Sequence, residues 1–198
     1  MASAMESESD IVTRRWRRTE YDRLVELGLF VGERLELLDG LLVVAEPQGS
    51  SHMAVVTHVG EVLMAVFGAG WHARLQGPLA LDDDSEPEPD VAIVTGRALD
   101  YVAAHPTMAA LIVEVADSSL RLDRRFKTAL YARAGQPEYW IVNLVDRVLE
   151  VHREPAIDAN AALGAFYRSV EILRAGAAVT PLGAPGARIA VADLLPPA

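Results

Sequence analysis

Cysteine is absent from this 198-residue chain, so the chain can form neither disulfide bonds nor thiolate metal sites. The absence fits a cytoplasmic protein, and we expect a cytoplasmic location. Long apolar runs are also missing, because none reaches, uninterrupted, the roughly 20 residues of a membrane-spanning helix. The N-terminus is polar and mixed in charge, unlike a secretory signal. We expect a flexible tail at residues 1–15 and a single domain at residues 16–198.

Lysine is almost absent. Of the 18 lysines and arginines, one is Lys127 and the other 17 are arginines. Coding bias towards arginine explains the general pattern but not the exception. A compact ammonium is better suited than a planar guanidinium to act on a water molecule or a phosphate. Lys127 is therefore a candidate functional residue.

Positive charge is scarce as a whole, since the formal net charge is −10. A non-specific DNA-binding protein is usually basic, because phosphate contacts supply most of its affinity. The acidic balance counts against nucleic acid unless basic groups gather on one face. Two local clusters exist, and solvated surface is the simpler explanation of both. They comprise Arg14, Arg15, Arg17 and Arg18, and then Arg121, Arg124 and Arg125.

The hydrophobic pattern predicts a mixed α/β (α+β) fold, with a mixed sheet flanked by helices. Asp39-Gly40 is a strong two-residue turn signal for a hairpin. Thr19 and either Ser50 or Ser51 are the expected helix N-caps. The predicted helices cover residues 19–28, 50–68 and 120–134; the hairpin covers 34–46; and the strands cover 72–83, 90–96, 110–117, 138–143 and 147–154.

Two carboxylates lie within apolar strands. Glu114 interrupts the run "ALIVEVAD", and Asp90 opens the neighbouring strand "DVAIV". Burying an ionised carboxylate is costly unless a partner or a metal compensates for it. Two carboxylates at the ends of adjacent strands would suit a hard divalent cation. The alternatives are a turn role for Asp90 and a salt bridge to a helix arginine for Glu114.

Lys127 lies on the helix that follows the Glu114 strand. Asp123, Lys127 and Tyr131 are spaced four apart, so they share one helix face. An ordinary Asp123–Lys127 ion pair is one explanation. The other is that the ammonium leans over the two carboxylates, where it could position water and stabilise charge on a phosphate.

The segments "EPEPDVAIV", "LIVEVADSSL" and "LDRRFKTALYARAGQPEYWIVN" occur in this order along the chain. With "RLELLDG" and "PQGSSH" upstream and "LEVHREP" downstream, the chain resembles the Uma-type family of predicted restriction endonucleases, within the PD-(D/E)xK nuclease superfamily. The resemblance covers roughly residues 16–155. It implies a restriction-endonuclease-like core.

The resemblance assigns roles to the carboxylates and the lysine. Pro89-Asp90 matches the "PD" element, and Glu114 matches the acidic member of the (D/E)xK element. The position two residues after Glu114 holds Ala116 where the superfamily has lysine. The resemblance suggests that the lysine has moved to the following helix, as Lys127.

Further residues are implied by the same resemblance. Glu36 matches a recurrent glutamate that would complete the metal site, although an outward-facing strand residue is the alternative. His52 matches a recurrent histidine at a helix start, where capping or packing is the simpler role. The backbone carbonyl of Val115 would help to bind the metal. Asp123 and Tyr131 are accessory candidates.

The leading hypothesis is a DNA endonuclease that uses Mg²⁺ or Mn²⁺. Asp90 and Glu114 would bind the metal, Lys127 would orient water, and Glu36 would assist. One alternative is a non-catalytic nucleic-acid- or protein-binding module on the same fold, as the net charge suggests. Another is a hydrolase of small phosphodiesters.

A homodimer is expected by analogy with nucleases that pair two active sites across a two-fold axis. Tyr139, Trp140 and Phe166 are candidates for a partly exposed apolar surface that a partner could cover. Packing in the core is the default role of such residues.

Overall fold

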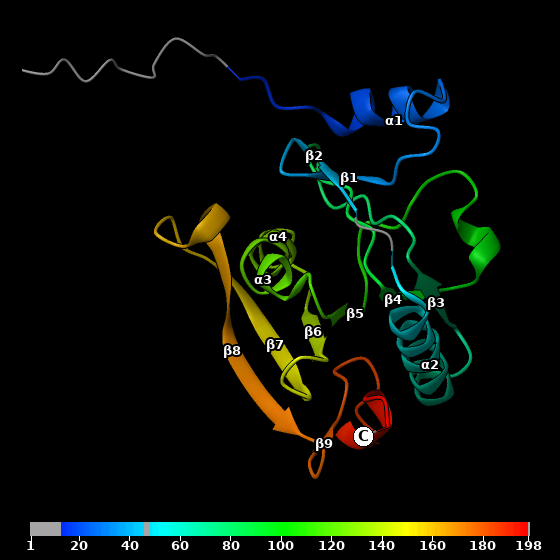
Figure 1. Ribbon diagram of the computed structural model, residues 1–198, viewed down its shortest axis with the longest axis vertical. Coiled ribbons are helices and arrows are strands. Elements are labelled where there is room, and N and C mark those ends of the chain that lie inside the picture. The colour runs from blue at the N-terminus through cyan, green and yellow to red at the C-terminus, as the bar shows by residue number, and fades with distance from the viewer. Residues whose placement is uncertain (1–12, 46–47, 198) are drawn as a thin grey trace, which may run out of the picture.

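A six-stranded mixed sheet forms the centre of the computed structural model, which describes residues 13–45 and 48–197 (Figure 1). The strand order is β3-β4-β5-β6-β7-β8, and β5 and β6 are its one parallel pair. The strands are β3 (Trp71–Leu75), β4 (Val91–Thr95), β5 (Leu111–Ala116), β6 (Glu138–Asn143), β7 (Val148–Ile157) and β8 (Ala165–Arg174). The predicted fold class is confirmed.

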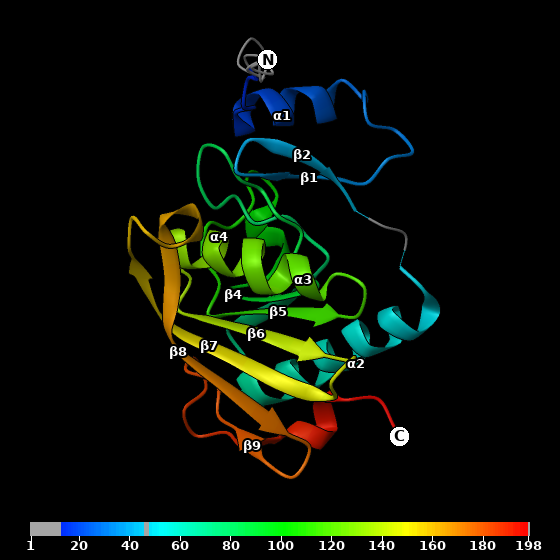
Figure 2. The ribbon, with the colours of Figure 1, turned by 60° about the vertical axis from the view of Figure 1, so that its left-hand side comes forward.

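Helices cover both faces of this sheet (Figure 2). Helix α2 (Ser50–Phe67) packs on one face. The other face carries one continuous helical segment made of α3 (Leu120–Leu122), the π-helical turn η2 (Asp123–Lys127) and α4 (Thr128–Arg133). Because both faces are covered, every residue of β5 and of β6 is buried. This explains their nearly continuous apolar sequences.

Helix α2 is, by length and composition alone, long and apolar enough to cross a membrane. Its Val55, Val59, Leu63 and Phe67 are buried against the sheet, in the same cluster as Val113. A helix that packs on a sheet in this way can have the same length and apolar composition as a membrane-spanning helix, so these two features do not distinguish them.

The predicted hairpin is formed by β1 (Leu35–Leu38) and β2 (Leu41–Val44), which make a separate two-stranded sheet. Asp39 and Gly40 both have positive φ, 50° and 74°, as a tight hairpin turn requires. A Cβ on Gly40 would lie 2.6 Å from Cβ of Arg15, so glycine is needed there for space as well. The backbone N–H of Gly40 donates to the carbonyl of Asp84 at 2.7 Å, which docks the hairpin onto the chain leading to β4.

The remaining elements are short. Helix α1 (Arg18–Glu26) precedes the hairpin, and η1 (Ala98–Tyr101) lies between β4 and β5. The turn η3 (Ala162–Gly164) joins β7 to β8. The C-terminal part contains β9 (Ala178–Val179), β10 (Ile189–Ala190) and η4 (Val191–Leu194). Residues 1–12 of the predicted tail lie outside the described residues.

Three local predictions were wrong. The N-cap of α1 is Arg17 rather than Thr19, because the Glu20 carboxylate accepts the Arg17 N–H at 3.0 Å, so the helix begins two residues earlier than a Thr19 cap implies. The N-cap of α2 is Gly49, not Ser50 or Ser51. The strand predicted over residues 72–83 ends at Leu75, since Gln76 has a positive φ of 49°.

Two of the three aromatic residues suggested for an exposed surface are core residues. Tyr139 and Trp140 are fully buried, which excludes them from a partner interface, whereas Phe166 is 37% exposed. The Trp140 indole N–H donates to Glu138 at 2.9 Å, so its polar atom is satisfied inside the core.

A histidine on β7 makes the stability of the protein depend on pH. His152 is 5% exposed, packs against Tyr139 and Tyr167, and has no hydrogen bond on either ring nitrogen among the described residues. Burial lowers its pKa to about 4, against the opposing charge of Glu150. The unfolded chain therefore binds this proton at a higher pH than the folded protein does. Stability should fall as pH drops from about 6.5 towards 4.

We expect His152→Phe to remove the part of the pH dependence of stability that His152 causes. Between pH 7 and pH 5, the free energy of unfolding should fall by about 2 kcal/mol more in the wild type than in the variant. Urea unfolding of both proteins at the two pH values measures the difference. Equal losses in the two proteins would contradict the assignment.

Candidate active site

Asp90 and Glu114 meet where the pairing of β4 with β5 ends. The last paired residues are Val91 and Val113, so Asp90 lies beside Glu114 just beyond the ladder. The Asp90 carboxylate takes the place of a strand partner, since its Oδ2 accepts the Val115 N–H at 2.8 Å. In return, Oε2 of Glu114 accepts the Asp90 N–H at 3.3 Å. Pro89 precedes Asp90 and has no N–H with which to extend the ladder.

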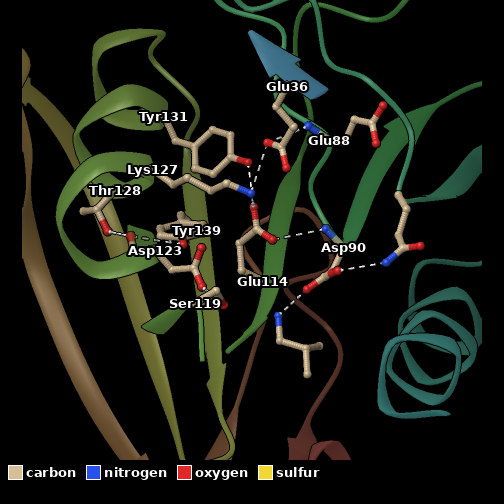
Figure 3. A network of polar contacts seen from close by, with 12 residues as sticks. Glu36, Glu88, Asp90, Glu114, Ser119, Asp123, Lys127, Thr128, Tyr131 and Tyr139 are labelled. Carbon is tan, nitrogen blue, oxygen red and sulfur yellow. Dashed lines mark hydrogen bonds and ion pairs between the residues drawn. The ribbon is translucent and has the colours of Figure 1, made fainter. Parts of the chain in front are cut away.

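Lys127 reaches this pair from the helical segment above the sheet (Figure 3). Its Nζ lies 3.0 Å from Oε1 of Glu114 and 3.3 Å from Oε2 of Glu36, and the lysine is only 5% exposed. Tyr131 donates its hydroxyl to the same Oε1 of Glu114 at 2.8 Å. Together with Asp90, five residues from four separate parts of the chain therefore form one buried network.

Asp123 does not pair with Lys127, contrary to the simpler explanation of their spacing. Its carboxylate accepts the Ser119 hydroxyl at 2.6 Å, and the Lys127 ammonium lies against Glu36 and Glu114. The two residues bound a π-helical turn, whose wider winding changes the usual i,i+4 geometry. Asp123 is nevertheless buried and lines the same cavity as Lys127.

Glu36 is supplied by the hairpin rather than by the main sheet. Its Oε2 accepts the Glu88 N–H at 3.2 Å as well as the ammonium of Lys127. Glu36 is 8% exposed, so it faces inwards, unlike the outward-facing alternative. The docked hairpin thus closes one side of the site.

His52 is the third residue of α2, and its Nε2 lies 3.1 Å from Oδ1 of Asp90. The amides of Gln48 and Gln76 each donate to the same oxygen at 3.3 Å. The histidine therefore orients a site carboxylate rather than capping the helix. The sequence analysis did not identify either glutamine as a site residue. Gln48 lies in the quoted segment "PQGSSH", but nothing in the sequence linked it or Gln76 to Asp90.

The electrostatics differ between the two strand-end carboxylates. Burial raises the pKa of Glu114 well above its ordinary value, and the Lys127 charge only partly opposes this. Burial would also raise the pKa of Asp90, but the hydrogen bonds and charge of His52 and the Val115 N–H outweigh it and hold that pKa low. Burial would lower the pKa of Lys127, yet the charges of Glu114 and Glu36 raise it, so the ammonium stays protonated.

A cavity of about 350 Å³ opens beside this network and connects it with solvent. Its walls come from the hairpin, the N-terminus of α2, the ends of β4 and β5, and α3 with η2. Arg34 stands at the rim, where its guanidinium pairs with Glu88 at 3.0 Å. A phosphate entering this cavity would meet Lys127, Arg34 and His52 as the basic groups of its lining.

The donor set suits a hard divalent cation. No group of three or more histidine, aspartate or glutamate side chains is arranged to hold a metal within the described ranges. Mg²⁺ commonly binds through one or two carboxylates and keeps several waters. Asp90 and Glu114 offer two adjacent carboxylates whose oxygens keep unused lone pairs beyond their present hydrogen bonds. The Val115 carbonyl points to the same strand edge as its N–H, which Asp90 binds.

The fold is shared with a solved nuclease-like structure. The chain matches the crystal structure of a putative nuclease belonging to DUF820 from Anabaena variabilis ATCC 29413, with a TM-score of 0.60 and 17% sequence identity. The match covers 82% of this chain and 89% of that one. Among curated proteins, none matches this chain significantly.

The family comparison is more specific. The Uma2 family, described as "Putative restriction endonuclease", matches residues 18–192. The chain therefore belongs to the Uma2 family. The family that the sequence motifs suggested is confirmed, and so is the nuclease-like fold.

Proposed function

We propose that the protein is a Mg²⁺- or Mn²⁺-dependent endonuclease that hydrolyses phosphodiester bonds in DNA. The observation that carries the proposal is the buried Lys127 ammonium, which lies between Glu36 and Glu114 beside Asp90. This set lines a solvent-connected cavity in a chain of a nuclease family. An ordinary structural ion pair would not need a third buried carboxylate and an open cavity.

Each residue has a distinct task in this proposal. Asp90 and Glu114, with the Val115 carbonyl, would hold the ion, which supplies Lewis-acid stabilisation of the phosphate and an activated water. Lys127 orients the attacking water and donates hydrogen bonds to the charge that develops on the phosphate. Glu36 keeps the ammonium in place.

Two further residues position the carboxylates. The His52 ring fixes Oδ1 of Asp90, and the Tyr131 hydroxyl fixes Oε1 of Glu114. Both carboxylates therefore need little reorganisation when the substrate arrives, which favours catalysis by positioning.

Nicking of supercoiled plasmid tests the proposal. Purified protein should convert the plasmid to open-circular and linear forms with Mg²⁺ or Mn²⁺, and EDTA should stop the conversion. Asp90→Asn, purified in the same way, should lose the activity because the amide replaces the charged ligand, and this excludes a contaminating nuclease. Equal cleavage by the variant would refute the assignment.

A metal-dependent activity on a fluorogenic phosphodiester, without cleavage of any plasmid or oligonucleotide, would point instead to a small-phosphodiester hydrolase. Metal-independent binding of nucleic acid without cleavage of either substrate would point to a binding module on the nuclease fold. The two cleavage assays and a binding assay, run together, therefore separate the three functions.

A further inference from the structure

A second hollow lies on the other side of the helical segment that supplies Lys127. It is an open groove of about 440 Å³ between η2 and α4 on one side and η3 and β8 on the other. Alanines from α4, η3 and β8 form much of its lining, and Phe166 contributes an aromatic ring. Phe166 is 37% exposed and stacks on no other ring within residues 13–45 and 48–197.

Arg124 and Arg125 line this groove, and Arg121 lies four residues before Arg125 on α3. The three arginines differ in their partners. Arg124 is neutralised by Glu150 at 2.7 Å and Asp146 at 3.3 Å. Arg121 and Arg125 are exposed and form no ion pair or hydrogen bond with any residue that the structure describes. In a chain with net charge −10, exposed arginines without a carboxylate partner leave positive charge available to an anionic ligand.

The groove and the active-site cavity share one wall. Leu122, Asp123 and Lys127 line the cavity, whereas Arg125 and Thr128 line the groove. Figures 1 and 2 show this helical segment between β8 and the end of β5. Since a helix is about 10 Å across, a strand of nucleic acid that crosses it would reach from one hollow to the other within a few nucleotides.

We infer that the groove binds an unpaired nucleotide of a single-stranded nucleic-acid segment, with its base stacked on Phe166 and its backbone held by Arg125. An exposed aromatic ring in a positively charged groove is the combination that single-strand binding requires. A base inside a duplex cannot offer its face to Phe166, because both faces are already stacked. The inference rests on the proposed function and adds to it a preference for substrates that carry a single-stranded segment next to the scissile bond.

Fluorescence anisotropy in EDTA tests the inference without any cleavage. The probes are a labelled single-stranded oligonucleotide and the duplex of the same sequence. Wild type should bind the single strand more tightly than the duplex. Phe166→Ala should weaken single-strand binding about 5- to 150-fold, and Phe166→Trp should retain it. Arg125→Ala should lower the salt dependence of single-strand binding by about 0.7 in the log–log slope.

Two variants on β8 serve as matched controls. Val170→Ala removes an exposed apolar side chain, and Arg174→Ala removes an exposed arginine, both outside the groove. Both should leave single-strand affinity within twofold of wild type. Equal affinity for duplex and single strand, or equal effects of Phe166→Ala and Val170→Ala, would overturn the inference.

The outcomes also separate this inference from the proposed function. If the protein cleaves plasmid but its single-strand affinity does not depend on Phe166, only the inference about the groove is overturned. If single-strand binding depends on Phe166 but no metal-dependent cleavage occurs, the result supports nucleotide binding by the groove. It counts against the proposed endonuclease activity. If the protein shows no single-strand binding and no cleavage, both the inference and the proposed function are overturned.

Discussion

Replacing Lys127 with alanine is expected to lower the rate of plasmid nicking by about 10²- to 10³-fold, the usual effect of removing one preorganised donor from a transition state. Lys127→Arg should not restore the activity. The ammonium occupies a compact, buried position between two carboxylate oxygens at 3.0 and 3.3 Å. A planar guanidinium is larger and cannot direct a single donor towards a water in that space.

The alanine variant needs a control for folding. Removing the ammonium leaves Glu36 and Glu114 buried without their cation, which costs about 3–5 kcal/mol of stability for a buried pair. Circular dichroism should therefore establish the melting temperature, and nicking should be measured well below it. Arg174→Ala, which removes an exposed cation, should cleave like wild type. A folded Lys127→Ala protein that cleaves at the wild-type rate would exclude Lys127 from the chemistry.

Replacing Glu114 with glutamine is expected to abolish both Mn²⁺ binding and cleavage. The side chain is 4% exposed and sits where Lys127, Tyr131 and the Asp90 N–H all donate to it. A glutamine must turn its NH₂ group towards one of these donors, so a hydrogen bond is lost together with the negative charge. Fewer charged ligands weaken the binding of a divalent cation.

Isothermal titration calorimetry with Mn²⁺ measures the metal affinity of the Glu114→Gln variant without using activity. Glu88→Gln is the matched control, because Glu88 lines the same cavity and the substitution makes the same change of charge. That control should retain measurable Mn²⁺ binding. Equal Mn²⁺ affinity in the two variants would show that Glu114 is not a ligand.

The central part of the site could be predicted from sequence because it follows the strand pattern. One carboxylate lies inside "LIVEVA" and another at the start of "DVAIV". An ionised carboxylate is costly to bury, so both residues stand out from the apolar strands around them in the sequence alone. Lys127 became a candidate because it is the single lysine in a chain that otherwise uses arginine. The structure brings Asp90, Glu114, Lys127 and Glu36 together within one hydrogen-bonded network.

Other parts of the site could not be predicted, because they depend on long-range docking or on local winding. Gln48 and Gln76 contact Asp90 only once α2 and β3 have packed. The π-helical turn has no sequence signal, yet it separates Asp123 from Lys127. The sequence pattern did not place the ten-residue strand β8, because its exposed apolar and charged residues do not alternate cleanly.

The hairpin that carries Glu36 is a sheet of its own, held to the rest of the fold by the segment around Asp84 and Glu86. The four charged groups of the site therefore belong to elements that could open separately: the hairpin, the two strand ends and the helical turn. In the proposed endonuclease, cleavage would therefore require all of these elements to stay docked, and local opening of any one of them would stop it. Heat inactivation should follow the least stable of these contacts and not the melting of the apolar core.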